Sequence, residues 1–161
     1  MDAVAVWFGE TLGGYIPAEW IVFLVSMLPI LECRAGIVVG RLLGLPLGMT
    51  LVFSVVGNIL PIPFILLFIR KIFAWLKPTK LFGKLVCKLE DRAMQKSSAL
   101  KKGEFIGLLL FVGIPLPGTG AWTGSLIASL MRVDIKKASL AILVGVAMAT
   151  TIMSLLMYGI L

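Results

Sequence analysis

The sequence contains no histidine and few charged side chains of any kind. Only 14% of its 161 residues are charged. Histidine is the side chain that titrates near neutral pH and the commonest metal ligand, so its absence removes the usual proton carrier and the usual metal site. We interpret Cys33 and Cys87 neither as disulfide partners nor as metal ligands. Because no nucleophile–base pair is recognisable either, we expect no metal, no cofactor and no enzymatic activity.

Hydrophilic stretches are also scarce, and they are confined to one part of the chain. Hydrophobic residues make up 60% of the sequence, and mean hydropathy is +1.07. These values are typical of an integral membrane protein. The net charge of +7 comes from basic residues that border apolar runs, which favours anionic membrane lipid over nucleic acid as a partner. A chain this small is expected to work as a homodimer.

The segment that organises the rest is residues 105–131, in which a Pro- and Gly-rich elbow joins two apolar arms. Each arm has about ten residues and would be about 15 Å long as a helix, whereas a bilayer core is about 30 Å thick. Pro115, Pro117, Gly118 and Gly120 rule out one straight helix through both arms. The segment therefore predicts a re-entrant hairpin. Its elbow would lie inside protein or beside a wet cavity at mid-membrane.

The same length argument divides the remaining apolar sequence. Residues 19–46 predict a second re-entrant hairpin, broken at Pro29 and with Glu32-Cys33-Arg34 as its elbow. Residues 47–69 and 134–161 are each long enough to span a membrane. The first span contains Pro61, so we expect a kink or break near its centre.

Two segments lie outside the hairpins and spans. Residues 1–18 are interpreted as an interfacial lead-in. Residues 70–104 have apolar side chains at helical spacing with lysines between them, which predicts a basic amphipathic helix at the interface. A solvated connector helix without a lipid role fits this segment equally well. The acidic start of the chain does not resemble a cleaved signal peptide.

The order hairpin, span, basic segment, hairpin, span indicates an internal duplication. A shift of 88 positions places Gly36 on Gly124 and Gly57 on Gly145. With one span in each copy, the two copies must have opposite orientations, as in many secondary transporters. The predicted fold is thus an all-α membrane protein. It is built as an inverted repeat of a re-entrant hairpin plus a transmembrane helix, with a basic cytoplasmic helix between the copies.

The distribution of basic residues predicts the orientation. Thirteen of the 15 Lys and Arg residues lie within residues 70–137. By the positive-inside rule, we expect residues 70–104 on the cytoplasmic side of the inner membrane and both termini on its outer side. The two hairpins then enter from opposite faces, and their elbows meet near the midplane.

Glu32 and Arg34 are the only charged residues that this layout buries. A charge at mid-membrane costs about 2.5–3.5 kcal/mol on insertion scales, which marks both as functional candidates. Arg34 offers a planar fork of donors that suits phosphate or carboxylate. Glu32 is the one group placed to carry a coupling proton. The structural alternative is a Glu–Arg pair that only pins the elbow.

The second elbow has the features of an anion site. Thr119 supplies a hydroxyl, and Gly118 and Gly120 allow close approach to backbone N–H groups. The arm that follows begins near Trp122, so the positive end of its helix dipole would point at the membrane centre.

Three further side chains have both a functional and a structural interpretation. Trp122 either lines the cavity or packs within the bundle. Asn58 either bonds the first elbow or caps the break at Pro61. Asp134 is expected to be the N-cap of the last span.

These motifs resemble a known family. Residues 115–124, PLPGTGAWTG, resemble the signature of the bacterial and archaeal "small multi-drug export" membrane family, whose hairpin-and-span repeat is similar to that of the DedA (VTT) superfamily. Residues 32–37 resemble that family's Glu-Leu-Arg-Gly-Ala-Ile, with Val38 where the family has proline. The resemblance implies a re-entrant-loop transporter. DedA relatives are associated with polyprenyl-phosphate or phospholipid headgroups and with proton coupling, and the family name implies drug export.

The function expected from the sequence is a transporter or flippase for an anionic amphiphile. Arg34, Thr119 and the elbow N–H groups would hold the phosphate, and Glu32 would carry the proton. One alternative is a cation/H⁺ antiporter for lipophilic drugs in which Glu32 binds drug or proton in turn. Another is a non-transporting structural or scramblase-like membrane protein.

Overall fold

A computed structural model describes residues 16–79, 82–96, 103–116 and 118–159. Residues 1–15 of the predicted interfacial lead-in and Pro117 of the second elbow lie outside the described residues, so the predictions for them are not addressed by the structure. The described residues form helices and turns, without a strand. In chain order the helices are α2 (Ala18–Met27), α3 (Glu32–Leu42), α4 (Leu47–Ile59), α5 (Ile62–Leu76), α6 (Gly83–Lys96), α7 (Glu104–Gly113), α8 (Ala121–Leu130) and α9 (Ile135–Tyr158).

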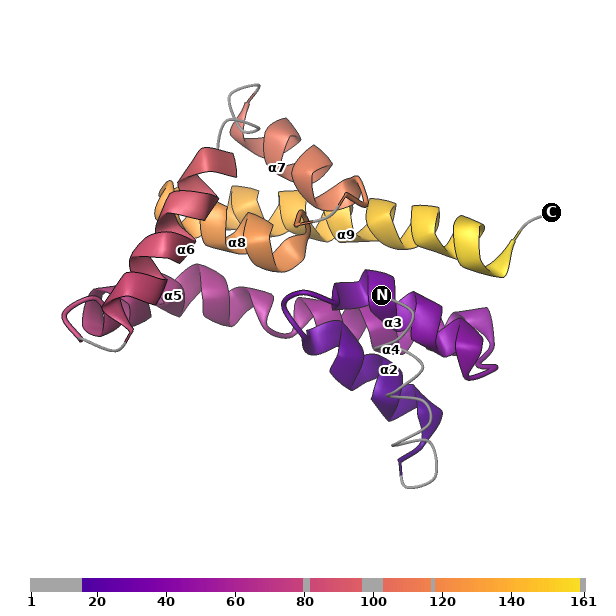
Figure 1. The fold of residues 1–161 in the computed structure, drawn as a ribbon. Coiled ribbons are helices and arrows are strands. Elements are labelled where there is room, and N and C mark those ends of the chain that lie inside the picture. Colours follow the sequence, from indigo (N-terminus) through magenta and orange to yellow (C-terminus); the bar gives the residue numbers. More distant parts are fainter. Residues whose placement is uncertain (1–15, 80–81, 97–102, 117, 160–161) are drawn as a thin grey trace.

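Two stretches are long and apolar enough to cross a membrane. One is α9, with 24 residues, and the other is the run Leu47–Leu76, with 30 residues, which combines α4 and α5. The two stretches lie side by side and run in opposite directions (Figure 1). Their outward-facing side chains are largely apolar, including Val52 at 60% and Leu156 at 66% exposure. Apolar surface of this extent is expected where a helix faces lipid.

The first of these stretches differs from the predicted span at its end. The expected break is present at Leu60 and Pro61, between α4 and α5. The helix does not stop at Ile69, however, but continues through Arg70 to Leu76. Arginine and lysine are good helix formers, and the next residue that cannot continue a helix is Pro78. The change from apolar to basic side chains is a change in what surrounds the helix, from apolar to polar, and it does not end the helix.

The short helices form two pairs, α2 with α3 and α7 with α8, as Figure 1 shows. The first pair corrects the predicted elbow. The turn comprises residues 28–31, and Glu32-Cys33-Arg34 is the first turn of α3. Pro29 disfavours a helical conformation at the residue before it, so α2 ends at Met27 and the turn comes earlier than the charged residues. In the second pair, residues 114–120 connect α7 to α8.

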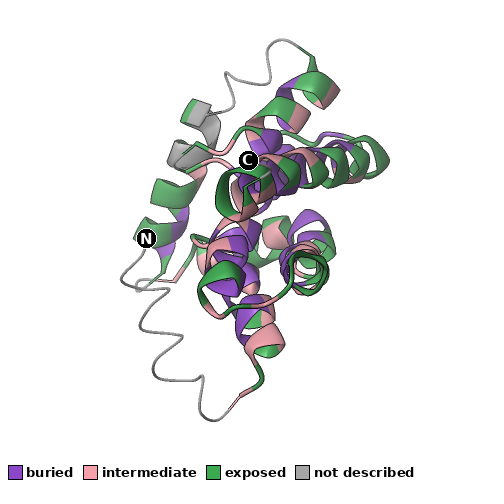
Figure 2. Cartoon of the chain, turned by 90° about the vertical axis from the view of Figure 1, so that its right-hand side faces the viewer, coloured by how far each residue is buried: buried purple, intermediate pink, exposed green. Residues whose placement is uncertain are grey.

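The short helices pack against the long ones at glycines. A Cβ at Gly57 of α4 would overlap the carbonyl group of Phe23 in α2. A Cβ at Gly145 of α9 would overlap the Val112 side chain and crowd the Leu109 carbonyl in α7. Buried residues line the faces where the helices meet, and exposed residues lie outside them (Figure 2). The larger core joins α5, α7, α8 and α9 and includes Cys33 of α3, and the smaller one joins α2 and α3.

Helix α6 occupies only part of the segment predicted to be a basic amphipathic helix. It contacts α5 and α8, with Val86 buried and Leu85 and Leu89 exposed. Lys77 and Glu90 form an ion pair at 2.7 Å that ties the end of α5 to α6. The hydrogen bond that Lys77 donates to the Glu90 carboxylate raises the pKa of Lys77.

The last long helix begins as predicted. The side chain of Asp134 accepts a hydrogen bond from the backbone N–H of Lys137 at 3.1 Å, which confirms Asp134 as the N-cap of α9. At the other end, the Tyr158 hydroxyl donates to the Leu45 carbonyl at 3.1 Å and lies 2.7 Å from the Thr50 hydroxyl. These contacts fix the end of α9 against the start of α4.

Candidate functional site

The Glu32 carboxylate lies at the N-terminus of α8. Its side chain is only 3% exposed. Its two oxygens accept hydrogen bonds from the backbone N–H groups of Ala121 at 3.2 Å and Trp122 at 3.0 Å. The first N–H groups of a helix have no partner within the helix, and they form the positive end of its dipole. The anion site predicted at this helix end is therefore occupied by a carboxylate of the chain itself.

Gly120 provides the room for this contact. A Cβ at residue 120 would overlap the Glu32 carboxylate. The φ angle of Gly120 is 134°, a conformation that other residues rarely adopt. Sequence analysis assigned Gly120 to the elbow because it allows close approach to backbone, and here the approaching group is Glu32.

Glu32 itself has unusual backbone geometry. Its φ angle is 54°, and the only other described non-glycine residue with positive φ is Arg132. Left-handed backbone at a residue with a side chain costs free energy, and such residues cluster at functional sites. The surrounding contacts thus hold Glu32 in a conformation that it would not adopt alone.

Arg34 binds the other side of the same elbow. Its Nη1 donates to the carbonyl oxygens of Leu116 at 2.9 Å and Thr119 at 3.0 Å. Its Nη2 donates to the carbonyl oxygens of Val112 at 3.1 Å and Ile114 at 3.2 Å. Carbonyls at the C-terminal end of a helix lack helical partners and carry the negative end of the dipole. Arg34 neutralises that end of α7.

The two charged side chains do not pair with each other. Within the described part of the chain, the ion pair present is Lys77–Glu90. Glu32 instead joins α3 to the start of α8, and Arg34 joins α3 to the end of α7 and to the connection itself, including Thr119. We call this arrangement the elbow latch: Glu32 on the N–H groups of α8, and Arg34 on the carbonyls at the end of α7.

Thr119 completes the elbow. Its hydroxyl lies 2.8 Å from the Leu116 carbonyl and 3.0 Å from the Ile114 carbonyl, and it accepts from Arg34 Nη2 at 3.2 Å. Gly118 has a φ of 73°, and Pro115 is half-buried. The described elbow residues thus surround the guanidinium. Pro29 lies exposed in the other turn, away from this ring of carbonyls.

Trp122 connects the elbow latch to an apolar groove. Its backbone N–H binds Glu32, while its side chain lines a groove of about 570 Å³ at the break between α4 and α5. Small-molecule sites typically have volumes of about 300–1,000 Å³. The indole Nε1 is buried without a hydrogen-bond partner. The other groove residues are Met27, Leu60, Pro61, Phe64, Ile65, Phe68, Ile69 and Ile72.

Asn58, in α4, lies beside Cys33, which belongs to the first turn of α3. It is completely buried, and apart from the neighbouring Cys33 thiol its amide oxygen and nitrogen have no hydrogen-bond partner. The Arg34 Nε is likewise buried and unpartnered. An unpaired buried amide costs about 1–3 kcal/mol. These atoms therefore leave donors and an acceptor available to a water or a ligand near the elbow.

The predicted candidates thus fall into three groups. Glu32, Arg34 and Thr119 come together in the elbow latch, and Trp122 lies between it and the groove. Asn58 lies beside Cys33, the residue between Glu32 and Arg34. Sequence reasoning missed the N–H groups of Ala121 and Trp122 as partners of Glu32, although a glycine directly before an apolar arm marks such a helix start. The described residues contain no cluster of three metal-ligating side chains.

Comparison with known proteins leads to one family. No curated protein and no solved structure matches the chain. A family model described as "Putative small multi-drug export protein" matches residues 32–152. The match begins at Glu32 and includes the whole elbow latch, and it covers well over half of the chain. The chain therefore belongs to the small multi-drug export family.

Proposed function

We propose that this protein is a secondary transporter of the inner membrane, built as an inverted repeat with two re-entrant hairpins. Several features support the proposal. α2, α7 and α8 have ten residues each, about 15 Å and too short to cross a bilayer. In each half the first short helix packs on the long stretch of the same half: α2 on α4, and α7 on α9. The second short helix also contacts the long stretch of the other half: α3 contacts α9, and α8 contacts α5. Gly57 and Gly145, aligned by the 88-residue shift, make corresponding contacts in the two halves.

The observation that carries the mechanism is the Glu32 carboxylate on the N–H groups of α8. Protonation of Glu32 removes its negative charge and weakens both hydrogen bonds, which frees the N–H groups of Ala121 and Trp122. An anionic group of the substrate can then bind these N–H groups, next to the Arg34 guanidinium. Substrate anion and Glu32 carboxylate compete for the same donors, so proton uptake and anion binding favour each other. Such mutual dependence is the thermodynamic requirement for coupling.

The apolar groove supports an amphiphilic substrate. A hydrocarbon portion would lie against Phe64 and Phe68, and the polar end would reach the elbow past Trp122. The unpartnered Trp122 Nε1 offers a further donor there. We therefore propose a lipid-like anion of the polyprenyl-phosphate or phospholipid type as substrate, and a homodimer as the working unit. This class of substrate is the one that a relation of the family to the DedA superfamily would imply.

The experiment is a binding titration against pH. Trp122 serves as the fluorescent reporter in a chain whose Trp7, Trp20 and Trp75 are replaced by Phe. The probe is dioctanoyl phosphatidylglycerol, a phosphodiester that does not titrate between about pH 5 and 8. We expect the affinity to fall as pH rises, because ionised Glu32 competes with the probe. Glu32→Gln should bind at least as tightly and lose this pH dependence.

The matched control is Glu104→Gln, an exposed carboxylate at the start of α7. This variant should keep the pH dependence. If the affinity of Glu32→Gln depends on pH in the same way as that of the chain that keeps Glu32, then Glu32 is not the coupling group, and the elbow latch is structural.

A second candidate function is export of lipophilic cationic drugs. It is favoured by the groove, whose lining contains no charged side chain, and by the family description. In this version Glu32 binds drug or proton in turn, and Arg34 lowers affinity for the cation. A flux assay distinguishes a non-transporting role from both transport functions. In that case vesicles that contain the purified protein would show no substrate flux.

A further inference from the structure

A second hollow lies at the ends of the two long apolar stretches. It has a volume of about 600 Å³ and is lined by the last turns of α5, the end of α8 and the start of α9. Arg70 and Lys71 come from α5, and Arg132 comes from the turn between α8 and α9. We call this hollow the basic cleft. Its place at the ends of both stretches is the level at which lipid headgroups lie when these helices cross a membrane.

The positive charge of the basic cleft is not balanced within the described structure. Arg70, Lys71 and Arg132 form no ion pair with any described residue. The one acidic residue that lines the cleft is Asp134, and its carboxylate accepts the N–H of Lys137. Three cations around one hollow repel one another, and an anion between them relieves the repulsion.

The position of Arg132 is unusual for a charged side chain. The Arg132 N–H bonds the Ser129 carbonyl, and the Val133 N–H bonds the Ala128 carbonyl. This is the pattern of a helix C-terminus whose left-handed residue is usually glycine. Arg132 occupies that position with a φ of 60°. The backbone favours glycine there, whereas arginine adds a guanidinium to the cleft.

The walls of the cleft distinguish a lipid from a free ion. Leu66 and Val133 are buried at its floor, and the exposed side chains of Leu67 and Ile135 flank it. A soluble phosphate would leave this apolar surface uncovered. The acyl chains of a lipid would cover it while the headgroup lies among the cations.

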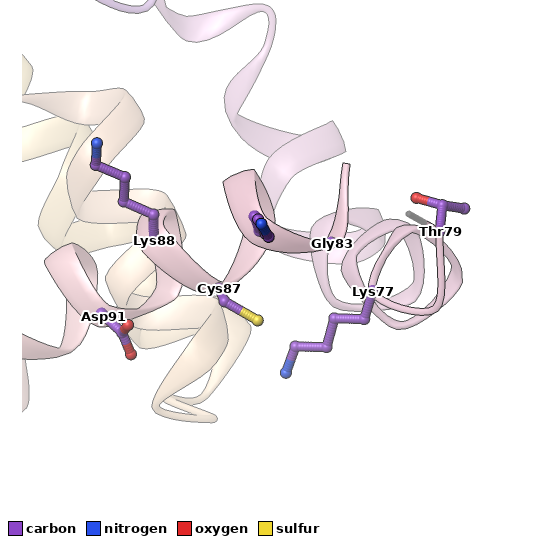
Figure 3. A pocket seen from close by; sticks show the side chains of 7 residues that line it. Lys77, Thr79, Gly83, Cys87, Lys88 and Asp91 are labelled. Atoms are coloured by element: carbon purple, nitrogen blue, oxygen red, sulfur yellow. The ribbon is translucent and has the colours of Figure 1, made fainter. Parts of the chain in front are cut away.

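A second basic hollow on α6 lacks these features. It is lined by Lys77, Lys84, Lys88 and Asp91, among others. Lys77 is paired with Glu90, and the Lys77 and Lys88 side chains extend away from each other (Figure 3). One of its cations is thus neutralised by an ion pair, and two of its lysines point apart, so it serves as the internal comparison.

We propose that the basic cleft binds the phosphate-bearing headgroup of an anionic membrane lipid, held by Arg70, Lys71 and Arg132. This site is separate from the elbow latch and does not depend on the transport proposal. Bound lipid would cross-link α5 to the α8–α9 turn, and so join the two halves of the molecule at that membrane face.

The test is native mass spectrometry of the full chain with phosphatidylglycerol and with phosphatidylcholine of equal chain length. The wild type should retain phosphatidylglycerol at least tenfold more strongly. Arg70→Gln/Arg132→Gln should lose that preference to within about twofold. Lys84→Gln/Lys88→Gln, which removes the same charge from α6, should keep it. Arg132→Lys, which preserves the charge, should keep most of it.

Two results would overturn the proposal. One is an equal loss of preference in both double variants, which would indicate attraction by net charge alone. The other is displacement of phosphatidylglycerol by inorganic phosphate at equal concentration, which would show that the cleft takes a free ion. Because all the exchanged side chains are exposed, each variant should elute like the wild type in size-exclusion chromatography.

Discussion

At the scale of single residues, Glu32 and Arg34 each compensate one end of a short helix. Glu32 accepts from the N–H groups of α8, and Arg34 donates to the Val112 and Ile114 carbonyls at the end of α7. Neither charge is left without compensation, although neither forms an ion pair. The same groups would bind a substrate anion in the proposed mechanism, so stability and function depend on the same hydrogen bonds.

Replacing Arg34 tests both roles. Arg34→Ala removes one charged donor from each of four backbone carbonyls, two of which, Ile114 and Leu116, keep other donors. We expect a loss of about 2–4 kcal/mol in stability, since hydrogen bonds to charged groups contribute about 1.5–3 kcal/mol each and are not additive. Binding of an anionic amphiphile should be lost, and Arg34→Lys should restore it in part because a lysine cannot present the planar fork. Thermal unfolding and titration with an anionic and a cationic amphiphile measure these effects. Unchanged anion binding in Arg34→Ala would support the drug-export alternative.

Gly120→Ala tests the space in which Glu32 lies. The new Cβ would overlap the carboxylate and would also require an unfavourable φ. We expect a destabilisation of about 2–4 kcal/mol from crowding and backbone strain together. Gly103→Ala is the matched control, since Gly103 has a φ of 112° but no atom within 4 Å of the added Cβ. It should show only the smaller cost of the backbone conformation, and equal losses at both positions would mean that Glu32 does not occupy this space.

At the scale of helices, close contact between a short and a long helix is made through glycine. In α4, Gly57 faces the Phe23 carbonyl, whereas Gly48 faces open space. This difference allows two changes of the same kind within one helix to be compared.

Gly57→Ala and Gly48→Ala should have opposite effects on stability. Alanine at residue 57 would push α2 away from α4, because a backbone carbonyl cannot rotate aside, and we expect a loss of about 1–3 kcal/mol. Alanine at residue 48 improves helix propensity and should gain about 0.5–1 kcal/mol. Unfolding in detergent measures both. A gain at residue 57 would mean that α2 does not approach α4 as closely as described.

At the scale of the whole molecule, the proposed inverted repeat leads to a prediction about topology. Thirteen of the basic residues lie within residues 70–137, so by the positive-inside rule we expect that part of the chain, apart from the hairpin 105–131, on the cytoplasmic side. The two long stretches run in opposite directions (Figure 1), so the C-terminus should lie on the opposite side from α6.

Cysteine labelling from outside the cell tests this topology. In a chain whose Cys33 and Cys87 are replaced by serine, Gly159→Cys should react with a membrane-impermeant maleimide. Lys88→Cys should react only after the membrane is opened. Labelling of Lys88→Cys in intact cells would overturn both the orientation and the inverted-repeat proposal.

The sequence by itself determined where the chain can and cannot be helical. The break at Pro61 and the N-cap at Asp134 both follow from local chemistry: proline lacks a backbone donor, and a short acidic side chain satisfies a helix start. The end of α5 was misjudged, because basic side chains change the surroundings of a helix without ending it. The first elbow was misplaced for a related reason, since buried charge was taken as the sign of a turn.

Only the tertiary structure decided what the charged residues touch. The partners of Glu32 and Arg34 are backbone groups more than 70 residues away in the chain, and every residue but proline carries the same N–H and C=O groups. The sequence marks the start of α8 as a set of free N–H groups, but no side-chain pattern indicates that Glu32 is the group that binds them or that Arg34 binds the carbonyl of Val112. They become partners because α7 and α8 end there, and because packing brings those ends to the first turn of α3. The unpaired cations of the basic cleft meet for the same reason, since only packing brings the end of α5 to the α8–α9 turn.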